Sequence, residues 1–271
     1  LKPAFACARI HKHHRLLQEI ALGGFVEILN RLEREWRAGA DAANTHATAD
    51  TILAAEADGT ASHGVLQATG YAAAIRAGLV NGTAAPRLLP GPEAAVIVAG
   101  DGGSSATAYA LGLPALAERA EALGAAVLCV RNVAHYAAMW HEVEFLAERG
   151  LAAFACTANF PYVAPHGGRR PFFGTNPIAF AFPRTDARPV VFDFAVSTMA
   201  RGSIQIALRA GANVPAGVGI DRAGRDRIEI LEFRYERLRF EEFQHDVAAR
   251  HAFDAVRQRN TEGAELGQAA E

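Results

Sequence analysis

The chain has 271 residues, of which 51% are hydrophobic and 21% charged, a composition typical of a soluble globular protein and unlike that of a disordered one. Its formal net charge of -2, without a long basic patch, gives no reason to expect a nucleic-acid partner. No stretch reaches the roughly 18 apolar residues of a membrane span, and the first residues lack the order of a signal peptide. We therefore expect a cytoplasmic protein with no nucleic-acid or membrane partner.

The cysteines Cys7, Cys129 and Cys156 are few and are not spaced as metal ligands. Cys129 and Cys156 lie inside apolar runs, where a reduced and buried thiol is the common arrangement. We therefore predict that both thiols are buried and reduced, as in a protein of the cytoplasm.

The first helix is predicted within residues 1–40, where Leu, Ile, Phe and Val recur at spacings of three and four with charges between them. His11, His13 and His14 lie in this stretch. Neighbouring histidines in an exposed terminal segment more often bind nothing than a metal ion, and we expect no metal site. A second, alanine-rich helix is expected over residues 41–57.

A Ser-His-Gly motif occupies residues 62–64. Asp58-Gly59 ends the helix before it, and another helix is predicted over residues 65–77. His63 would therefore sit at a helix start, exposed enough to reach a ligand. The ordinary pKa of histidine, about 6.5, suits proton transfer near neutrality, and the Ser62 hydroxyl could hold the ring tautomer or join a relay. The alternative is a purely structural Ser–His pair.

Strands and helices then alternate along the chain. A strand is predicted within residues 86–103 and another, buried strand over 125–131, with a helix over 106–123 between them. A further helix ends at Gly150, and the next strand follows it directly. This alternation predicts an α/β (mixed α+β) fold.

A glycine-rich turn over residues 101–105 separates the first of these strands from its helix. A strand, a glycine-rich turn and a helix in this order can together bind a phosphate group. The spacing matches neither G-x-G-x-x-G nor G-x-x-x-x-G-K-[ST], so we favour a plain tight turn.

Residues 165–202 place Gly, Pro, His, Arg, Thr, Asn and Asp between short apolar runs, the pattern of polar loops at the ends of buried strands. The runs cover residues 178–182 and 189–192, and Asp193 follows the second. We expect any chemistry to converge on this stretch. After residue 224 the chain becomes rich in Arg and Glu, which predicts one or two charged, solvated helices.

Four motifs together carry a resemblance to a known family. They read ADGTASHGV, HYAAMWHEVEFLAERGL, APHGGRRPFFGTNPIAFAFP and VFDFAVSTMARGSIQIA. In this order they resemble the type-2 malate/L-lactate dehydrogenase family over about residues 44–224. The sequences of the second and third motifs look most like those of the delta-1-piperideine-2-carboxylate / delta-1-pyrroline-2-carboxylate reductases.

The resemblance implies a homodimeric enzyme with a non-Rossmann NAD(P)-binding mixed sheet flanked by helices, which explains the missing G-x-G-x-x-G. We expect a reductase of a small cyclic 2-imino carboxylate, with NADPH favoured over NADH. One alternative is a 2-hydroxy-acid dehydrogenase of the malate or lactate type. Another is an inactive or truncated homologue that keeps only a binding or assembly role.

The resemblance also assigns residues. His63 would be the proton donor and Ser62 its relay partner. The expected cofactor contacts are His135, Tyr136, Ala137, Ala138, Met139, Asp193, Phe194 and Ala195. The expected substrate contacts are Gln67, Thr175, Arg201 and Gly202, with the Arg201 guanidinium as clamp for the substrate carboxylate.

Two positions depart from the reductases. Gln67 stands where they place an arginine, and Ser203 stands where they place the relay carboxylate, so the substrate class stays open. We divide the chain into a helical part over residues 1–85 that contributes the Ser–His motif, an NAD(P)-binding sheet domain over 86–224, and a charged helical tail over 225–271 that departs from the family.

Overall fold

The computed structural model describes residues 39–134, 138–159, 161, 163–220 and 226–227. The chain divides into two compact units, Leu1–Ile228 and Glu229–Glu271, and the described residues all belong to the first. The helix expected within residues 1–40, with its histidines and Cys7, lies almost wholly outside the described residues, and so does the charged tail. The three-part division of the chain stays a prediction.

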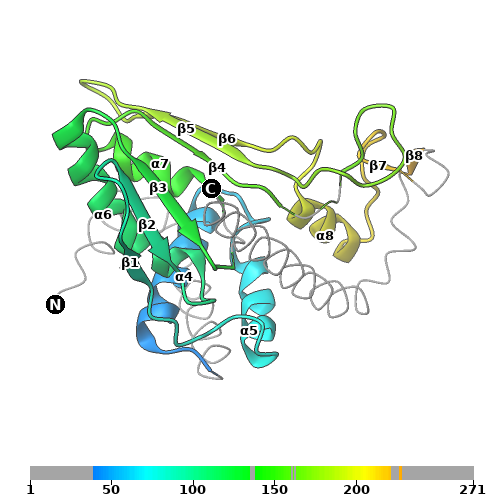
Figure 1. Ribbon diagram of the computed structural model, residues 1–271. Coiled ribbons are helices and arrows are strands. Elements are labelled where there is room, and N and C mark those ends of the chain that lie inside the picture. Colours follow the sequence, from blue (N-terminus) through cyan, green and yellow to red (C-terminus); the bar gives the residue numbers. More distant parts are fainter. Residues whose placement is uncertain (1–38, 135–137, 160, 162, 221–225, 228–271) are drawn as a thin grey trace, which may run out of the picture. The chain divides into compact units, whose positions relative to one another are not determined.

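Two helices bracket the Ser-His-Gly motif (Figure 1). Helix α4 (Ala42–Ala57) begins where the Asp41 carboxylate accepts the backbone N–H of Asn44 at 2.9 Å, and it ends before Gly59, whose φ of +72° suits glycine. The expected helix over residues 65–77 starts as a 3-10 turn, η1 (Val65–Gln67), and continues as α5 (Ala68–Arg76). Both predicted helices are therefore confirmed.

The first sheet is mixed and has the order β1-β2-β3. Strand β1 (Arg87–Leu89) pairs antiparallel with β2 (Ala95–Ala99), and β2 pairs parallel with β3 (Val127–Arg131). Helix α6 (Ser105–Leu123) makes the crossover that a parallel pair requires. The sequence predicted β2, α6 and β3, but not β1.

The glycine-rich turn between β2 and α6 is a plain turn. The N–H of Gly102 donates to the carbonyl of Asn132, and the N–H of Gly103 donates to the carbonyl of Gly100, both at 2.9 Å. The Ser104 hydroxyl accepts the N–H of Ala106 and so caps α6. Because these N–H groups are already used, the turn does not present them to a phosphate group.

The second sheet is antiparallel, with the order β4-β5-β6. It consists of β4 (Ala153–Cys156), β5 (Ile178–Phe182) and β6 (Val190–Phe194). Helix α7 (Trp140–Ala147) lies against it. Strand β6 extends beyond the second apolar run of the sequence and includes Asp193.

The two faces of this sheet differ in side-chain size. Ala153, Ala179 and Ala181 are buried in the same core cluster as residues of α7, and their small size lets the helix approach closely. The register places Phe180 between Phe154 and Phe192 on the opposite face, where Phe154 is 63% exposed. Alternation along each strand therefore separates an alanine face from a phenylalanine face.

The prediction that the strand over residues 125–131 and both internal thiols are buried was wrong. Leu128 and Val130 of β3 pack on the core, whereas Val127 and Cys129 point to the other face and are exposed. Cys156 is exposed for the same reason. An apolar run alone does not show that only one of its two faces will be covered.

After the second sheet come α8 (Arg201–Arg209), β7 (Gly219–Ile220) and β8 (Asp226–Arg227). The predicted mixed α/β class is confirmed, although the described strands form separate small sheets. Among the described helices, none has both the length and the apolar composition needed to cross a bilayer.

Candidate functional site

The Ser62–His63 pair lies in the turn between α4 and η1. Ser62 is 8% exposed and its Oγ lies 3.0 Å from Nδ1 of His63, the hydrogen-bond direction depending on the ring tautomer. His63 is partly buried, less open than its predicted place at a helix start suggested. With Nδ1 engaged, Nε2 is the ring nitrogen that makes no hydrogen bond to any described residue.

Two side chains hold this turn in shape. The Glu56 carboxylate, from α4, accepts the N–H of Val65 at 3.0 Å. The side-chain amide of Gln67 donates to the carbonyl of Ser62 at 2.6 Å. Gln67, predicted to contact substrate, is thus also tied to the backbone of the Ser–His pair, while the part played by Glu56 had no signal in the sequence.

The start of α8 meets the same turn. A Cβ built on Gly202 would lie 2.2 Å from the carbonyl oxygen of Ser62, so only glycine allows this approach. Gly202 is buried and the neighbouring Arg201, the first residue of α8, is exposed. The structure therefore brings Gly202 to the Ser–His pair. Nothing in the sequence indicated that Gly202 lies in a helix.

The Asp193 carboxylate links β6 to the start of α7. Its Oδ2 accepts the backbone N–H groups of Met139 at 2.6 Å and of Trp140 at 3.0 Å. Ala138 and Met139 are buried, and the Met139 side chain is part of the core. We call these two hydrogen bonds the Asp193 clamp.

The other predicted cofactor residues are distributed as follows. His135, Tyr136 and Ala137 lie outside the described residues. Phe194 is exposed and stacks on Phe192 with ring centroids 5.5 Å apart.

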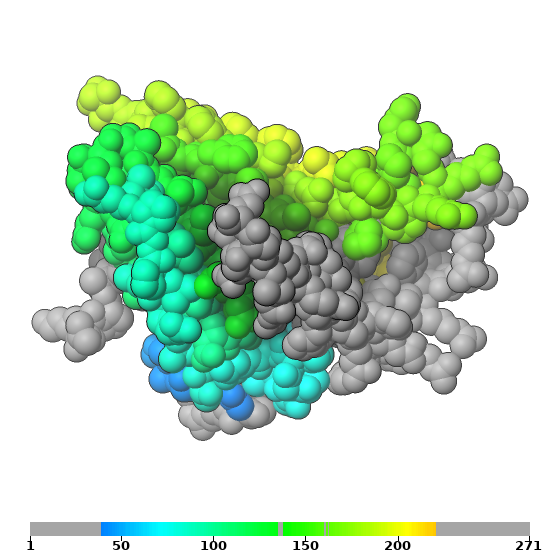
Figure 2. Space-filling view, in the orientation of Figure 1, coloured from blue at the N-terminus to red at the C-terminus, as the bar shows by residue number. Residues whose placement is uncertain are grey.

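Thr175 belongs to the loop before β5. Its carbonyl accepts the N–H of Val196 at 2.9 Å, which joins this loop to the segment that contains Ala195. Among the described residues, no hydrogen bond joins Thr175 to His63. The preceding loop is at the surface in Figure 2, and Phe172 is 72% exposed, so only the later part of the stretch 165–202 meets the Ser–His turn.

Two electrostatic effects shift the pKa of His63 in opposite directions. Burial lowers the pKa of the imidazole below its ordinary value, and the negative charge of Asp193 acts in the opposite direction. The Asp193 carboxylate is thus near enough to influence His63 while its Oδ2 accepts the N–H groups of α7. A partly buried histidine with a carboxylate nearby suits a group that gives and takes a proton.

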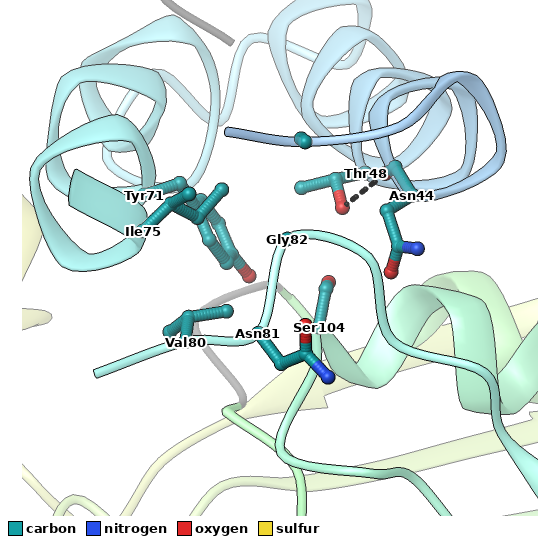
Figure 3. A pocket seen from close by; sticks show the side chains of 9 residues that line it. Asn44, Thr48, Tyr71, Ile75, Val80, Asn81, Gly82 and Ser104 are labelled. Carbon is teal, nitrogen blue, oxygen red and sulfur yellow. Dashed lines mark hydrogen bonds between the residues drawn. The ribbon is translucent and has the colours of Figure 1, made fainter. Parts of the chain in front are cut away.

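A small pocket lies elsewhere, between α4, α5 and the loop before β1 (Figure 3). Asn44 and Thr48 of α4 and Tyr71 and Ile75 of α5 line it together with residues 80–82. None of the predicted site residues lines this pocket.

Replacing Asn44 by alanine is expected to lower the free energy of unfolding by about 1–3 kcal/mol, the usual cost of an unpaired buried polar group. The Asn44 amide donates to the Ala84 carbonyl at 3.0 Å and so ties α4 to the segment before β1. Urea denaturation measures the change. The exposed His46→Ala on the same helix is the control, and equal stability of the two variants would contradict the prediction.

Comparison with known proteins identifies the family. Residues 35–229 match the malate/L-lactate dehydrogenase family, and the chain belongs to it, as the sequence motifs predicted. It is 47% identical over 182 residues to the Delta(1)-pyrroline-2-carboxylate/Delta(1)-piperideine-2-carboxylate reductase of Pseudomonas aeruginosa, covering 67% of this chain and 54% of that protein. A reductase of the same description from Pseudomonas putida is 40% identical over 201 residues, 74% of this chain and 59% of that protein.

Solved structures agree with this assignment. Delta1-piperideine-2-carboxylate reductase from Pseudomonas syringae pv. tomato superposes with a TM-score of 0.70 at 38% identity, covering 74% of this chain and 61% of that chain. Malate dehydrogenase from Entamoeba histolytica gives a TM-score of 0.67 at 27% identity, and the match covers 75% of this chain and 56% of that chain. The chain spans about half the length of the curated relatives it matches.

Proposed function

We propose that this protein is an NAD(P)H-dependent reductase of a small cyclic 2-imino carboxylate, delta-1-piperideine-2-carboxylate or delta-1-pyrroline-2-carboxylate. The observation that carries the proposal is the Ser62–His63 pair, held in a partly buried turn with Nε2 left for substrate. The activities for which the relatives from two Pseudomonas species are named supply the substrate class. The proposal extends to NADPH ahead of NADH, a homodimer, and a place in the cytoplasm.

One buried hydroxyl near the predicted cofactor contacts fits a bound ligand. The Ser197 hydroxyl, close in sequence to the predicted cofactor contact Ala195, is buried and has no hydrogen-bond partner among the described residues, as expected of a group that awaits a ligand. The N–H groups of Met139 and Trp140 are held by Asp193 and are not left for a phosphate group. When bound, the cofactor supplies the hydride to the carbon of the substrate C=N bond.

His63 would supply the proton. Its Nε2 donates to the substrate nitrogen as that nitrogen gains electron density, while the Ser62 hydroxyl holds Nδ1 and thereby the orientation of the ring. Burial lowers the pKa of His63, so the imidazolium gives up its proton readily. The Asp193 charge acts against this effect and favours the return of a proton between turnovers.

Replacing Arg201 by lysine is expected to raise the Michaelis constant roughly tenfold with a smaller effect on kcat, because a planar bidentate fork is lost while the charge remains. Steady-state kinetics measure both constants. Arg209→Lys, at the opposite end of α8, is the matched control. An unchanged Michaelis constant in Arg201→Lys would mean that another residue binds the substrate carboxylate.

A 2-hydroxy-acid dehydrogenase is the second candidate. Ser203 in place of the relay carboxylate favours it, as does the structural likeness to a malate dehydrogenase. The third candidate, a homologue that only binds or assembles, draws on the same substitution and on Gln67.

One assay separates the three candidates. Oxidation of NADPH and of NADH by the purified protein is followed with piperideine-2-carboxylate, pyrroline-2-carboxylate, pyruvate and oxaloacetate. We expect turnover with the cyclic imines. Turnover with the oxo acids alone would favour the second candidate, and no turnover together with no cofactor binding would favour the third.

A further inference from the structure

Two carboxyl groups lie at the start of α7. Asp193 reaches it from β6 through the Asp193 clamp. Glu142 lies in the first turn of the helix itself and is 6% exposed, and its Oε2 is buried with no hydrogen-bond partner among the described residues. The mechanism proposed above uses Asp193 but gives no role to Glu142.

The two groups have opposite surroundings. The Asp193 oxygen accepts two N–H groups at a helix N-terminus, where the helix dipole also favours negative charge. Glu142 has no such partners for its Oε2, and an ionised carboxylate is costly to bury without them. Asp193 is therefore the charged member of the pair, and Glu142 the member that keeps its proton.

The nearby Glu144 shows that burial alone does not decide this. It is buried to the same extent as Glu142, but its Oε1 lies 3.4 Å from the guanidinium of Arg188. A cation thus accompanies Glu144, whereas none of the described cations contacts Glu142. The contrast makes Glu144 the natural control for Glu142.

The titratable groups that influence Glu142 come from two other elements. Burial is the main cause that raises the pKa of Glu142 to about 8; its own backbone N–H acts against this, and the charge of Asp193 on β6 adds a smaller raising effect. Tyr109 on α6 lies near it, and burial followed by the Glu142 charge raises the pKa of the phenol. The strands β4 and β5 bring alanines to α7. The charge of Asp193 also acts to raise the pKa of His63 against the lowering by burial, so the same carboxylate influences both Glu142 and His63.

We propose that Glu142 is a positioning residue, the uncharged partner of Asp193 in a carboxyl pair that keeps a single negative charge at the start of α7, within electrostatic reach of His63. As long as Glu142 holds its proton, Asp193 stays ionised in the clamp and the electrostatic field at His63 is that of one carboxylate. Loss of the Glu142 proton places a second charge in the same buried region, which competes with Asp193 and changes the proton affinity of His63. The role of His63 in this inference rests on the proposed function.

Nuclear magnetic resonance of the full chain tests the proposal without cofactor or substrate. The side-chain carboxyl carbon of Glu142 and the imidazole of His63 are followed from pH 5 to about pH 9.5. We expect the Glu142 carboxyl to titrate near pH 8 and the His63 signal to show a second inflection at the same pH. Glu142→Gln should abolish that inflection, and Glu144→Gln should keep it.

Stability gives a second, independent measurement. Between pH 4.5 and about 8 the folded protein holds a proton on Glu142 that the unfolded chain releases, so stability falls as the pH rises through this window and levels off above it. Glu142→Gln should lose this component of the pH dependence of Tm.

Titration of the wild-type Glu142 carboxyl near its ordinary pKa would overturn the proposal, and so would an inflection of His63 that persists in Glu142→Gln. Both measurements need no turnover. If the titrations and the pH dependence of Tm come out as expected but the substrate assay shows no turnover, the result would therefore count against the proposed function alone.

Discussion

His63→Ala is expected to lower turnover by roughly 100-fold or more, the usual contribution of a general acid, while cofactor affinity stays nearly unchanged. The structure supports this size of effect because the ring is partly buried and its Nδ1 is already engaged by Ser62 at 3.0 Å. Alanine removes the proton and leaves space in which a water molecule cannot be held with the same orientation. Stopped-flow and steady-state rates with a cyclic imine measure the loss.

The matched control is His166→Ala, which removes a histidine from an exposed loop and should leave turnover unchanged. Added imidazole should restore part of the activity of His63→Ala, since it can occupy the vacated space and carry the proton. Turnover of His63→Ala within a few-fold of wild type would exclude His63 from the mechanism.

The second large effect is expected for Gly202→Ala. The new Cβ would lie 2.2 Å from the Ser62 carbonyl oxygen and 2.9 Å from its carbon, so α8 and the Ser–His turn must move apart. A displacement of about 1 Å at a reacting group can cost roughly 100-fold in rate. Overpacking against backbone also lowers the free energy of unfolding, by about 1–3 kcal/mol.

Arg209→Ala, at the opposite end of α8, separates this contact from a general effect on the helix, and it should change both quantities little. Rates and urea denaturation are measured on the same preparations. Full activity and full stability of Gly202→Ala would show that the close approach of α8 to Ser62 has no functional consequence.

The sequence predicted the elements whose ends are determined locally. Helix α4 starts at the Asp41 cap and stops at Gly59, and α6 starts at the Ser104 cap and stops at Gly124, whose φ is +83°. These side chains and glycines act on their own helix, so neighbouring residues suffice to predict them. The family was predictable for a similar reason, because its motifs are contiguous.

Features that depend on contacts between distant segments were missed. No local pattern shows that the carboxylate of Asp193 caps α7, that Gly202 faces Ser62, or that Oε2 of Glu142 is buried with no hydrogen-bond partner among the described residues. The exposure of Cys129 was missed because an apolar run does not show which of its two faces the helices will cover. The predicted roles of the site residues remain predictions for the experiments above.

The Asp193 clamp has a consequence for the order of folding. Its two hydrogen bonds join residues 54 and 53 positions apart in the chain, and contacts of such long range form only after the entropy of closing the intervening loop has been overcome. Helices α4 and α6 depend on local caps and can form earlier. In refolding from urea, recovery of helical circular dichroism should therefore precede recovery of the native environment of His63, so the Ser–His turn reaches its native structure after the helices around it.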